Sequence, residues 1–283
     1  MSTLILAESG STKTDWRIIR NRKVVHAART SGINPYLQPT AEIRRLLRKE
    51  FPEDCGLTKK RSVVFYGAGV GSPEKKADLA EVLQNFFDTS AVEVATDMFG
   101  AARALCGHQK GVVCILGTGS NSCYYDGEQI VDQHASLGYI AGDEGSGNYL
   151  GKKVLQYYAY KTFDEELTAA FETLWGNDLS GILKSLYADP FPNRYLAGFT
   201  TLLIEYREHF MVENILEDAF TAFFTRHLFK YRQTWKGPVH FAGSVAWQFR
   251  DVLAEICHNH EIELGTVVQA PMDDLVRYHL ARA

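Results

Sequence analysis

A loop rich in glycine and hydroxyl side chains occurs twice in this chain, and each copy lies between two strand-like segments. The first copy covers residues 10–14 after an apolar run, and the second covers residues 117–121 after another. In both places the pattern predicts a strand, a tight turn and a second strand. Such a turn exposes backbone N–H groups and hydroxyls with little side-chain bulk, which suits a phosphate group. Two facing loops would clamp a nucleotide between two halves of the protein.

Composition limits the class of protein. With 283 residues, 46% of them hydrophobic and 23% charged, the chain has core material for two domains of a soluble globular protein. The net charge of −4 argues against a nucleic-acid partner. No apolar run reaches the roughly 18 residues of a membrane span, and no signal-peptide pattern opens the chain. The five cysteines form no CxxC pair, so we expect reduced thiols in a cytoplasmic protein.

The strand pattern around the loops repeats. Residues 4–9, 15–20 and 23–28 predict a three-stranded meander, and residues 112–116, 120–125 and 129–133 predict another. The intervening chain alternates strands with helices, and residues 148–235 are mostly helical. The last segment returns to alternating elements. The shared pattern suggests a duplication with a cleft between the copies. The remaining predicted elements are helices over 41–50, 73–87, 98–105, 212–231, 246–258 and 272–283, and strands over 62–66, 92–95, 239–241 and 266–269.

Each loop also has a simpler interpretation as an ordinary polar hairpin turn. The first copy is not a Walker A loop, because the spacing is wrong and a strand follows it. Its hydroxyls and Lys13 suit phosphate oxygens, and Glu8 or Asp15 could hold Mg²⁺ through water. A third glycine loop, at Gly243 and Ser244, runs from a strand into a helix, where an adenine or ribose could pack on the backbone.

Asp97 ends a predicted strand just before a helix. A carboxylate at this end of a strand lies at the rim of an α/β cleft, where ligands bind. It could accept the proton of a substrate hydroxyl as that oxygen attacks phosphorus. The alternative interpretation is a cap for the helix that begins at Met98.

Two acids, Asp143 and Glu144, lie between glycines just before another predicted helix. Carboxylates accept hydrogen bonds from sugar hydroxyls well, whereas the alternative is capping of that helix. The histidines at positions 134, 240, 258 and 260 lack the company of other metal-ligating residues, and we interpret them as surface or core residues.

Taken in order, residues 8–16, 117–121 and 142–147 resemble motifs of the N-acetylglucosamine kinase branch of the BadF/BadG/BcrA/BcrD ATPase family, within the actin-like ATPase and sugar kinase superfamily. The resemblance covers nearly the whole chain. It implies an α/β fold of two ribonuclease-H-like lobes around a central cleft, with ATP and Mg²⁺ between them and a large helical insertion in the second lobe. The implied boundaries are 1–108 for the first lobe, 109–271 for the second and 272–283 for a helix that packs back on the first.

The resemblance also implies site residues. Asp97 matches the catalytic base, and Asn34, Asp97 and Asp143 match positions that hold the amino sugar. Glu8 would hold Mg²⁺ through water, although many relatives have Asp there. The nucleotide-binding residues implied by the three loops are Gly10, Ser11, Thr12, Lys13, Gly117, Thr118, Gly119, Gly243 and Ser244.

These residues lead to a functional hypothesis: ATP-dependent phosphorylation of a hexosamine, with N-acetylglucosamine as the expected sugar and its 6-hydroxyl as the acceptor. The expected partners are a small-molecule amino sugar and, from the family, a second copy in a homodimer. Two alternatives stay open. One is an ATPase that activates a dehydratase through an iron–sulfur cluster, which needs cysteine ligands. The other is a sugar sensor without turnover.

Overall fold

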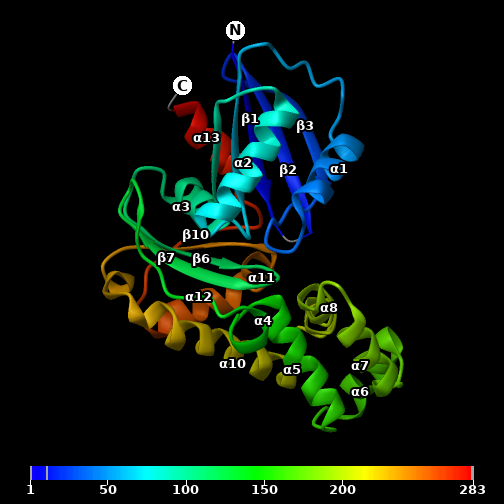
Figure 1. The fold of residues 1–283 in the computed structure, drawn as a ribbon. Coiled ribbons are helices and arrows are strands. Elements are labelled where there is room, and N and C mark those ends of the chain that lie inside the picture. Colours follow the sequence, from blue (N-terminus) through cyan, green and yellow to red (C-terminus); the bar gives the residue numbers. More distant parts are fainter. Residues whose placement is uncertain (1, 11, 282–283) are drawn as a thin grey trace. The chain divides into compact units, whose positions relative to one another are not determined.

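The structure is a computed structural model that describes residues 2–10 and 12–281. The chain divides into two compact units (Figure 1). Unit 1 comprises Met1–Gln109, Gly127–Gln129 and Ala270–Ala283, and unit 2 comprises Lys110–Asp126 and Ile130–Gln269. Each unit contains one five-stranded sheet with helices packed against it.

The sheet of unit 1 has the strand order β3-β2-β1-β4-β5. The first three strands are antiparallel neighbours, and β4 and β5 run parallel to β1. The hairpin between β2 and β3 turns at Asn21 and Arg22, which both have positive φ, as the sequence predicts for a tight turn. The strands are β1 (Thr3–Ser9), β2 (Lys13–Arg20), β3 (Lys23–Ser31), β4 (Arg61–Gly67) and β5 (Val92–Thr96).

Alternation along the strands gives this sheet two buried faces. Ile5 and Ala7 point to one face, where they pack with helices α1 (Thr40–Glu50) and α2 (Pro73–Phe87). Leu6 points to the other face, which is covered by helices α3 (Asp97–Cys106) and α13 (Met272–Ala281). Figure 1 shows α13, coloured red at the end of the chain, beside the strands of unit 1. The last predicted helical residues, 282 and 283, lie outside the described residues.

The sheet of unit 2 has the order β10-β9-β6-β7-β8, which is the topology of unit 1 read from the other edge. Again the first three strands are antiparallel neighbours and the later two run parallel to the first. The predicted α/β fold of two ribonuclease-H-like halves is therefore confirmed. The strands are β6 (Gly111–Leu116), β7 (Ser120–Tyr125), β8 (Ile130–Asp132), β9 (Val239–Ala242) and β10 (Leu264–Val268).

Most helices of unit 2 lie between β8 and β9, as the sequence predicts. Their apolar side chains form one core with the sheet, to which α10 contributes a row of phenylalanines. The helices are α4 (Gly138–Ala141), α5 (Gly147–Ala159), α6 (Glu165–Trp175), α7 (Leu179–Ala188), α8 (Pro192–Gly198), α9 (Thr200–Glu205), α10 (Phe210–Arg226), α11 (Ser244–Gln248) and α12 (Arg250–Asn259), with short 3₁₀ helices η1 (Leu228–Lys230) and η2 (Arg232–Trp235).

Two predicted helices of unit 2 have wrong boundaries. The helix predicted over 212–231 ends at Arg226, because Arg226 and His227 turn to contact Glu144 and the chain continues as 3₁₀ turns. The helix predicted over 246–258 is two helices, which meet at Phe249, a buried residue outside the α-helical conformation.

Neither a membrane helix nor a disulfide is found in the described part of the chain. No helix among residues 2–10 and 12–281 is long and apolar enough to cross a membrane. All five cysteine side chains are buried as thiols. Burial raises the pKa of several of these thiols, Cys106 and Cys257 to about 12, so they stay protonated at neutral pH.

Candidate active site

The first glycine loop is a tight turn between β1 and β2. The backbone N–H of Gly10 donates to the carbonyl oxygen of Lys13 at 3.0 Å, and a side chain at Gly10 would meet nothing within 4 Å. The Lys13 ammonium lies 2.8 Å from the Asp15 carboxylate. Thr12 is exposed, and Ser11 lies outside the described residues. The loop therefore offers backbone and a lysine to a ligand with little bulk in front of them.

Three carboxylates of unit 1 gather behind this loop. Glu8 is paired directly with Asp15 across β1 and β2, and Asp97 follows β5 at the same end of the sheet. Burial, and then the charges of Asp97 and Asp15, raise the pKa of Glu8 to about 7. Burial acts against Asp15 as well, but hydrogen bonds from Lys13 and Arg29 outweigh it and lower the pKa of that carboxyl. A cation at this cluster would stabilise the charged form of Glu8.

Asp97 is the first residue of α3, not its cap. The cap is Thr96, whose hydroxyl accepts a hydrogen bond from the N–H of Phe99 at 3.2 Å. The Asp97 carboxylate accepts a short-range bond from the N–H of Met98, at 2.8 Å. Burial raises its pKa. The capping alternative for Asp97 is therefore wrong.

Asn34 lies in a turn that β1 holds in place. The hydroxyl of Ser9 bonds both the N–H and the carbonyl of Ile33, at 2.9 and 3.1 Å. The side-chain oxygen of Asn34 accepts from the N–H of Tyr36 at 3.0 Å, and Gly69 lies so close that a side chain there would collide with this oxygen. Gly69 has a φ of +77°, which also favours glycine. The Asn34 side chain is thus fixed before any ligand arrives.

The second glycine loop is fastened to the start of α5 in unit 2. Backbone N–H groups of Gly147 and Asn148 donate to the carbonyls of Gly117 and Thr118, at 2.8 and 3.0 Å. The side-chain amide of Asn148 donates to the same Thr118 carbonyl at 2.6 Å. A side chain at Gly117 would meet nothing within 4 Å, so the loop backbone is open on its other side.

Asp143 packs directly on this second loop. Its carboxylate accepts from the Asn148 amide at 2.7 Å and from the backbone N–H of Ser120 at 3.3 Å. A side chain at Gly119 would come within 2.9 Å of it, so Gly119 permits the approach. Burial raises the pKa of Asp143 against the lowering effect of these hydrogen bonds. Asp143 also has a φ of +63°, a strained value for a non-glycine residue.

The neighbouring acid, Glu144, is held by the end of α10. It forms ion pairs with Arg226 and His227, the latter at 3.0 Å, and is itself almost fully buried. The cap of α5 is Ser146, whose hydroxyl accepts from the N–H of Tyr149. Neither acid is therefore a helix cap. The glycine-rich backbone of residues 142–147, whose ordering costs conformational entropy, places both carboxylates.

A pocket of about 500 Å³ lies next to Asp143 within unit 2. Two buried polar atoms at its wall, the hydroxyl of Ser120 and Nε2 of His134, have no hydrogen-bond partner among the residues that the structure describes. Such atoms are expected to meet water or a ligand. The lining residues are Ser120, His134, Ala135, Ser136, Leu137, Ala141, Gly142, Asp143, Glu144, Arg226, His227 and Lys230.

The third glycine loop approaches the second. Gly243 has a φ of +123°, and a side chain there would collide with the carbonyl of Leu116, just before Gly117. Ser244 starts α11 immediately afterwards. Only glycine lets β9 turn into α11 at this distance from the second loop.

The predicted site residues fall into two sets, one in each unit. Unit 1 brings together Glu8, Lys13 and Asp97, with Asn34 in an adjoining turn. Unit 2 brings together the second loop, the third loop and Asp143. Sequence reasoning missed Asn148, although an asparagine in the first turn of a helix next to two acids is a detectable signal.

No group of three or more acidic, histidine or cysteine residues that could hold a metal occurs in the part of the chain that the structure describes. His240 is a core residue, as predicted, and accepts a hydrogen bond from the N–H of Thr266.

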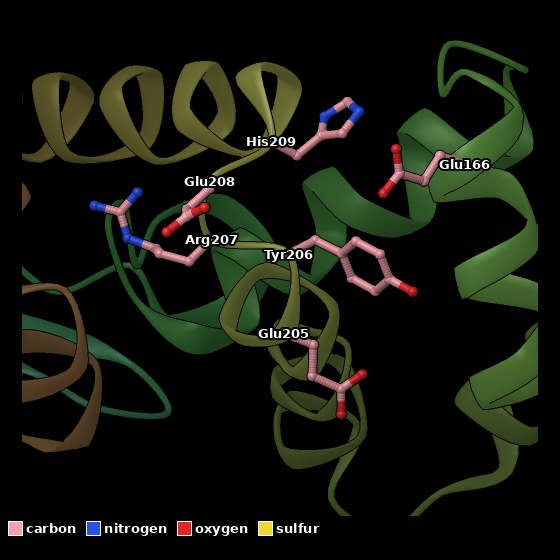
Figure 2. Close-up of a pocket in the computed structure, with 6 residues that line it drawn as sticks. All are labelled: Glu166, Glu205, Tyr206, Arg207, Glu208 and His209. Carbon is pink, nitrogen blue, oxygen red and sulfur yellow. The ribbon is translucent and has the colours of Figure 1, made fainter.

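A separate pocket of about 460 Å³ lies among the helices of the insertion, and none of its residues belongs to the predicted site. Figure 2 shows Arg207 turned away from Tyr206. Its guanidinium forms ion pairs with Glu213 and Asp251. The lining residues are Glu166, Glu205, Tyr206, Arg207, Glu208 and His209.

Comparison with known proteins identifies the family. No protein-family model matches the chain. A crystal structure from Porphyromonas gingivalis, of a protein provisionally assigned as an N-acetylglucosamine kinase, is 41% identical, covers 98% of this chain and 99% of its own, and superposes with a TM-score of 0.93. The chain belongs to the N-acetylglucosamine kinase branch of the BadF/BadG/BcrA/BcrD ATPase family. The prediction of an enzyme of the sugar kinase class is thereby confirmed.

Two further known proteins are similar to this chain, one in sequence and one in fold. The N-acetylmuramic acid/N-acetylglucosamine kinase of Clostridium acetobutylicum is 25% identical over 190 residues, which are 65% of this chain but only 61% of that protein. A Streptomyces griseus glucokinase, solved with glucose and AMPPNP, has a TM-score of 0.56 at 14% identity over 98% of this chain and 97% of its own. At that identity the likeness concerns the fold.

Proposed function

We propose that this protein transfers the terminal phosphoryl group of ATP to a hydroxyl of an amino sugar, with N-acetylglucosamine as the sugar and its 6-hydroxyl as the acceptor. The observation that carries the proposal is the position of Asp97. It is a half-buried carboxylate just after a strand, next to the capping residue Thr96, in a chain of a sugar kinase family. A carboxylate of this kind accepts the hydroxyl proton as the oxygen attacks phosphorus.

The glycine loops are proposed to hold the nucleotide. Residues 10–13 and 117–119 offer open backbone to the phosphates, since side chains at Gly10 and Gly117 would meet nothing. Gly243 and Ser244 are proposed to meet the adenosine. Backbone N–H groups and a lysine offset phosphate charge in the transition state.

Magnesium is proposed to bind through water beside Glu8 in unit 1. Carboxylates and water are the ligands that Mg²⁺ prefers, and burial, followed by the charges of Asp97 and Asp15, raises the pKa of Glu8, so a cation there would stabilise its charged form. Glu8 would hold the ion through water, and Asp15 lies beside it. When bound, the ion neutralises charge on the phosphates.

The sugar is proposed to meet Asn34, Asp97 and Asp143. The side-chain amide of Asn34 donates to no acceptor among the described residues, so its N–H groups suit a sugar oxygen. Asp143 lines the pocket of unit 2 together with the unpartnered atoms of Ser120 and His134.

The test is an ADP-release assay over a panel of N-acetylglucosamine, glucosamine, N-acetylmannosamine and N-acetylmuramic acid, with the Asp97→Asn variant alongside. We expect transfer to N-acetylglucosamine, and a loss of about 10²–10⁴ in rate with sugar binding retained in the variant. Asp88→Asn, at an exposed acid paired with Arg61, is the matched control and should keep full activity. A near-normal rate for Asp97→Asn would remove Asp97 from the role, and the absence of transfer to every sugar would refute the kinase.

The alternatives are less well supported. An iron–sulfur activator needs accessible thiolates, whereas Cys114 and Cys123 are buried in β6 and β7. Bound iron or colour in the purified protein would support the iron–sulfur alternative.

A cytoplasmic location and a homodimer remain predictions, and sedimentation at several protein concentrations tests the homodimer.

A further inference from the structure

Helix α3, which carries Asp97 at its first residue, packs unusually closely on strand β4. Gly100 lies one turn after Asp97, and a side chain at Gly100 would come within 2.9 Å of the Tyr66 side chain. The helix therefore rests directly on the fully buried Tyr66 ring. The tilt of α3, and with it the position of Asp97, depends on what holds this tyrosine and the far end of the helix.

A hydrogen-bonded cluster holds Tyr66 and the last turn of α3 in place. The hydroxyl of Tyr66 accepts from Arg103 Nη1, in the last turn of α3, at 2.7 Å and lies 3.0 Å from Nε2 of His279 on α13. The same Arg103 atom is 2.6 Å from Glu93 on β5. The guanidinium also covers the Phe99 ring, 4.1 Å from its centre. One buried hydroxyl thus joins β4, α3 and the C-terminal helix.

One hydrogen bond of this cluster has a fixed direction. An arginine has no acceptor, so the Tyr66 oxygen accepts from Arg103. The second bond joins the same oxygen to Nε2 of His279 at 3.0 Å, and its direction depends on the tautomer of the imidazole. Burial raises the pKa of Tyr66 to about 12, so the hydroxyl keeps its proton at working pH.

Both ends of α3 are consequently fixed, by Thr96 at the first turn and by the Tyr66 cluster at the last. A rigid helix of ten residues transmits a shift at one end to the other. A displacement of about 1 Å at a reacting group can cost on the order of a hundredfold in rate.

We propose that Tyr66, Arg103 and His279 form a positioning relay that holds Asp97 for proton transfer and makes α13 a working part of the active site. The relay rests on the proposed function of Asp97. These three residues act through the helix and touch no reacting atom, so they are positioning residues.

The test uses the full chain with three substitutions. Tyr66→Phe removes the hydroxyl and keeps the ring under Gly100, His279→Leu removes the hydrogen-bond partner of that hydroxyl, and His279→Gln restores a partner. We expect Tyr66→Phe and His279→Leu to lower kcat by about tenfold to a hundredfold, with the KM for ATP and sugar within about twofold of wild type. His279→Gln should recover most of the rate. The double variant Tyr66→Phe/His279→Leu should be no slower than the slower of its two single variants, because both substitutions break the same relay.

Tyr158→Phe is the matched control, since it also removes one tyrosine hydrogen bond, to Glu172 in unit 2, and should leave kcat unchanged. Melting temperatures distinguish a positioning role from a purely structural one. A purely structural role would lower the melting temperatures of His279→Leu and His279→Gln alike and would leave the kcat of the folded protein unchanged. Full kcat in Tyr66→Phe and His279→Leu with an active wild type would overturn the relay alone. An inactive wild type over the sugar panel would refute the proposed function instead.

Discussion

The side-chain amide of Asn148 is bonded at 2.7 Å to the Asp143 carboxylate and at 2.6 Å to the Thr118 carbonyl. One asparagine therefore joins an acid of the proposed sugar site to the second glycine loop. Because its nitrogen contacts two oxygens, the orientation of the amide is fixed by the contacts. Its side-chain oxygen is buried with no partner among the described residues.

Replacing Asn148 by aspartate should loosen the loop. The change removes the donor to Thr118 and sets a second carboxylate against Asp143 in a buried position, where like charges repel. We expect a loss of about 1–3 kcal/mol in unfolding free energy and a rise of about tenfold in the KM for ATP. Urea unfolding and initial-rate kinetics measure both. Asn177→Asp, at an exposed position between α6 and α7, is the control and should change neither. An unchanged KM for ATP would separate Asn148 from nucleotide binding.

Gly243→Ala tests the contact between the third and second loops. Alanine at a φ of +123° is strained, and its Cβ would collide with the Leu116 carbonyl. We expect destabilisation of about 1–3 kcal/mol and weaker ATP binding, read by thermal unfolding with and without ATP. Gly198→Ala provides the comparison, because a side chain there meets nothing at the end of α8 and should be tolerated. Equal stability of the two variants would contradict the steric argument.

Local signals in the sequence were sufficient for the fold and for much of the site. Alternating apolar residues and the turn at Asn21 predict the first meander, and a repeated meander predicts two similar sheets. Long-range contacts were not accessible in this way. Tyr66 and His279 are separated by 213 positions, and no local pattern links a tyrosine in a strand to a histidine in the last helix. The end of α10 at Arg226 was missed for the same reason, since Glu144 lies far away in sequence.

Glu8 makes stability depend on pH in a defined direction. Its pKa in the folded protein is about 7, above the ordinary 4.5. The stability that this carboxyl contributes is thus fully present below pH 4.5 and is lost as the pH rises through 7. Glu8→Gln carries no buried charge, so we expect it to exceed the wild type by about 1–3 kcal/mol above pH 7 and to match it near pH 4.5.

Urea unfolding at pH 4.5 and 8.5, without divalent ions, measures this difference. Added Mg²⁺ at pH 8.5 should stabilise the wild type more than Glu8→Gln, because the substitution removes one of the charges that the ion compensates. The same stability difference at both pH values would show that Glu8 does not titrate as argued.

Glu144 gives the opposite pH dependence. Burial alone would raise its pKa, but the hydrogen bonds from His227 and Arg226 outweigh burial and lower it below the ordinary 4.5. Its contribution to stability is therefore present above pH 4.5 and is lost as the pH falls through the lowered value. Glu144→Gln should be less stable than the wild type by about 1–3 kcal/mol at pH 7, because Arg226 and His227 lose their charged partner.

This difference should shrink as the pH falls from 4.5 through the lowered pKa of Glu144, where the wild-type carboxyl also becomes neutral. Because Glu144 adjoins Asp143, the variant should also raise the KM for the sugar more than that for ATP. Thermal unfolding from pH 3 to 8 and kinetics at pH 7 test both expectations. Glu172→Gln, at an exposed acid on α6, is the matched control and should leave stability and both KM values unchanged. A pH-independent difference would mean that the ion pair with α10 does not hold the turn that carries Asp143.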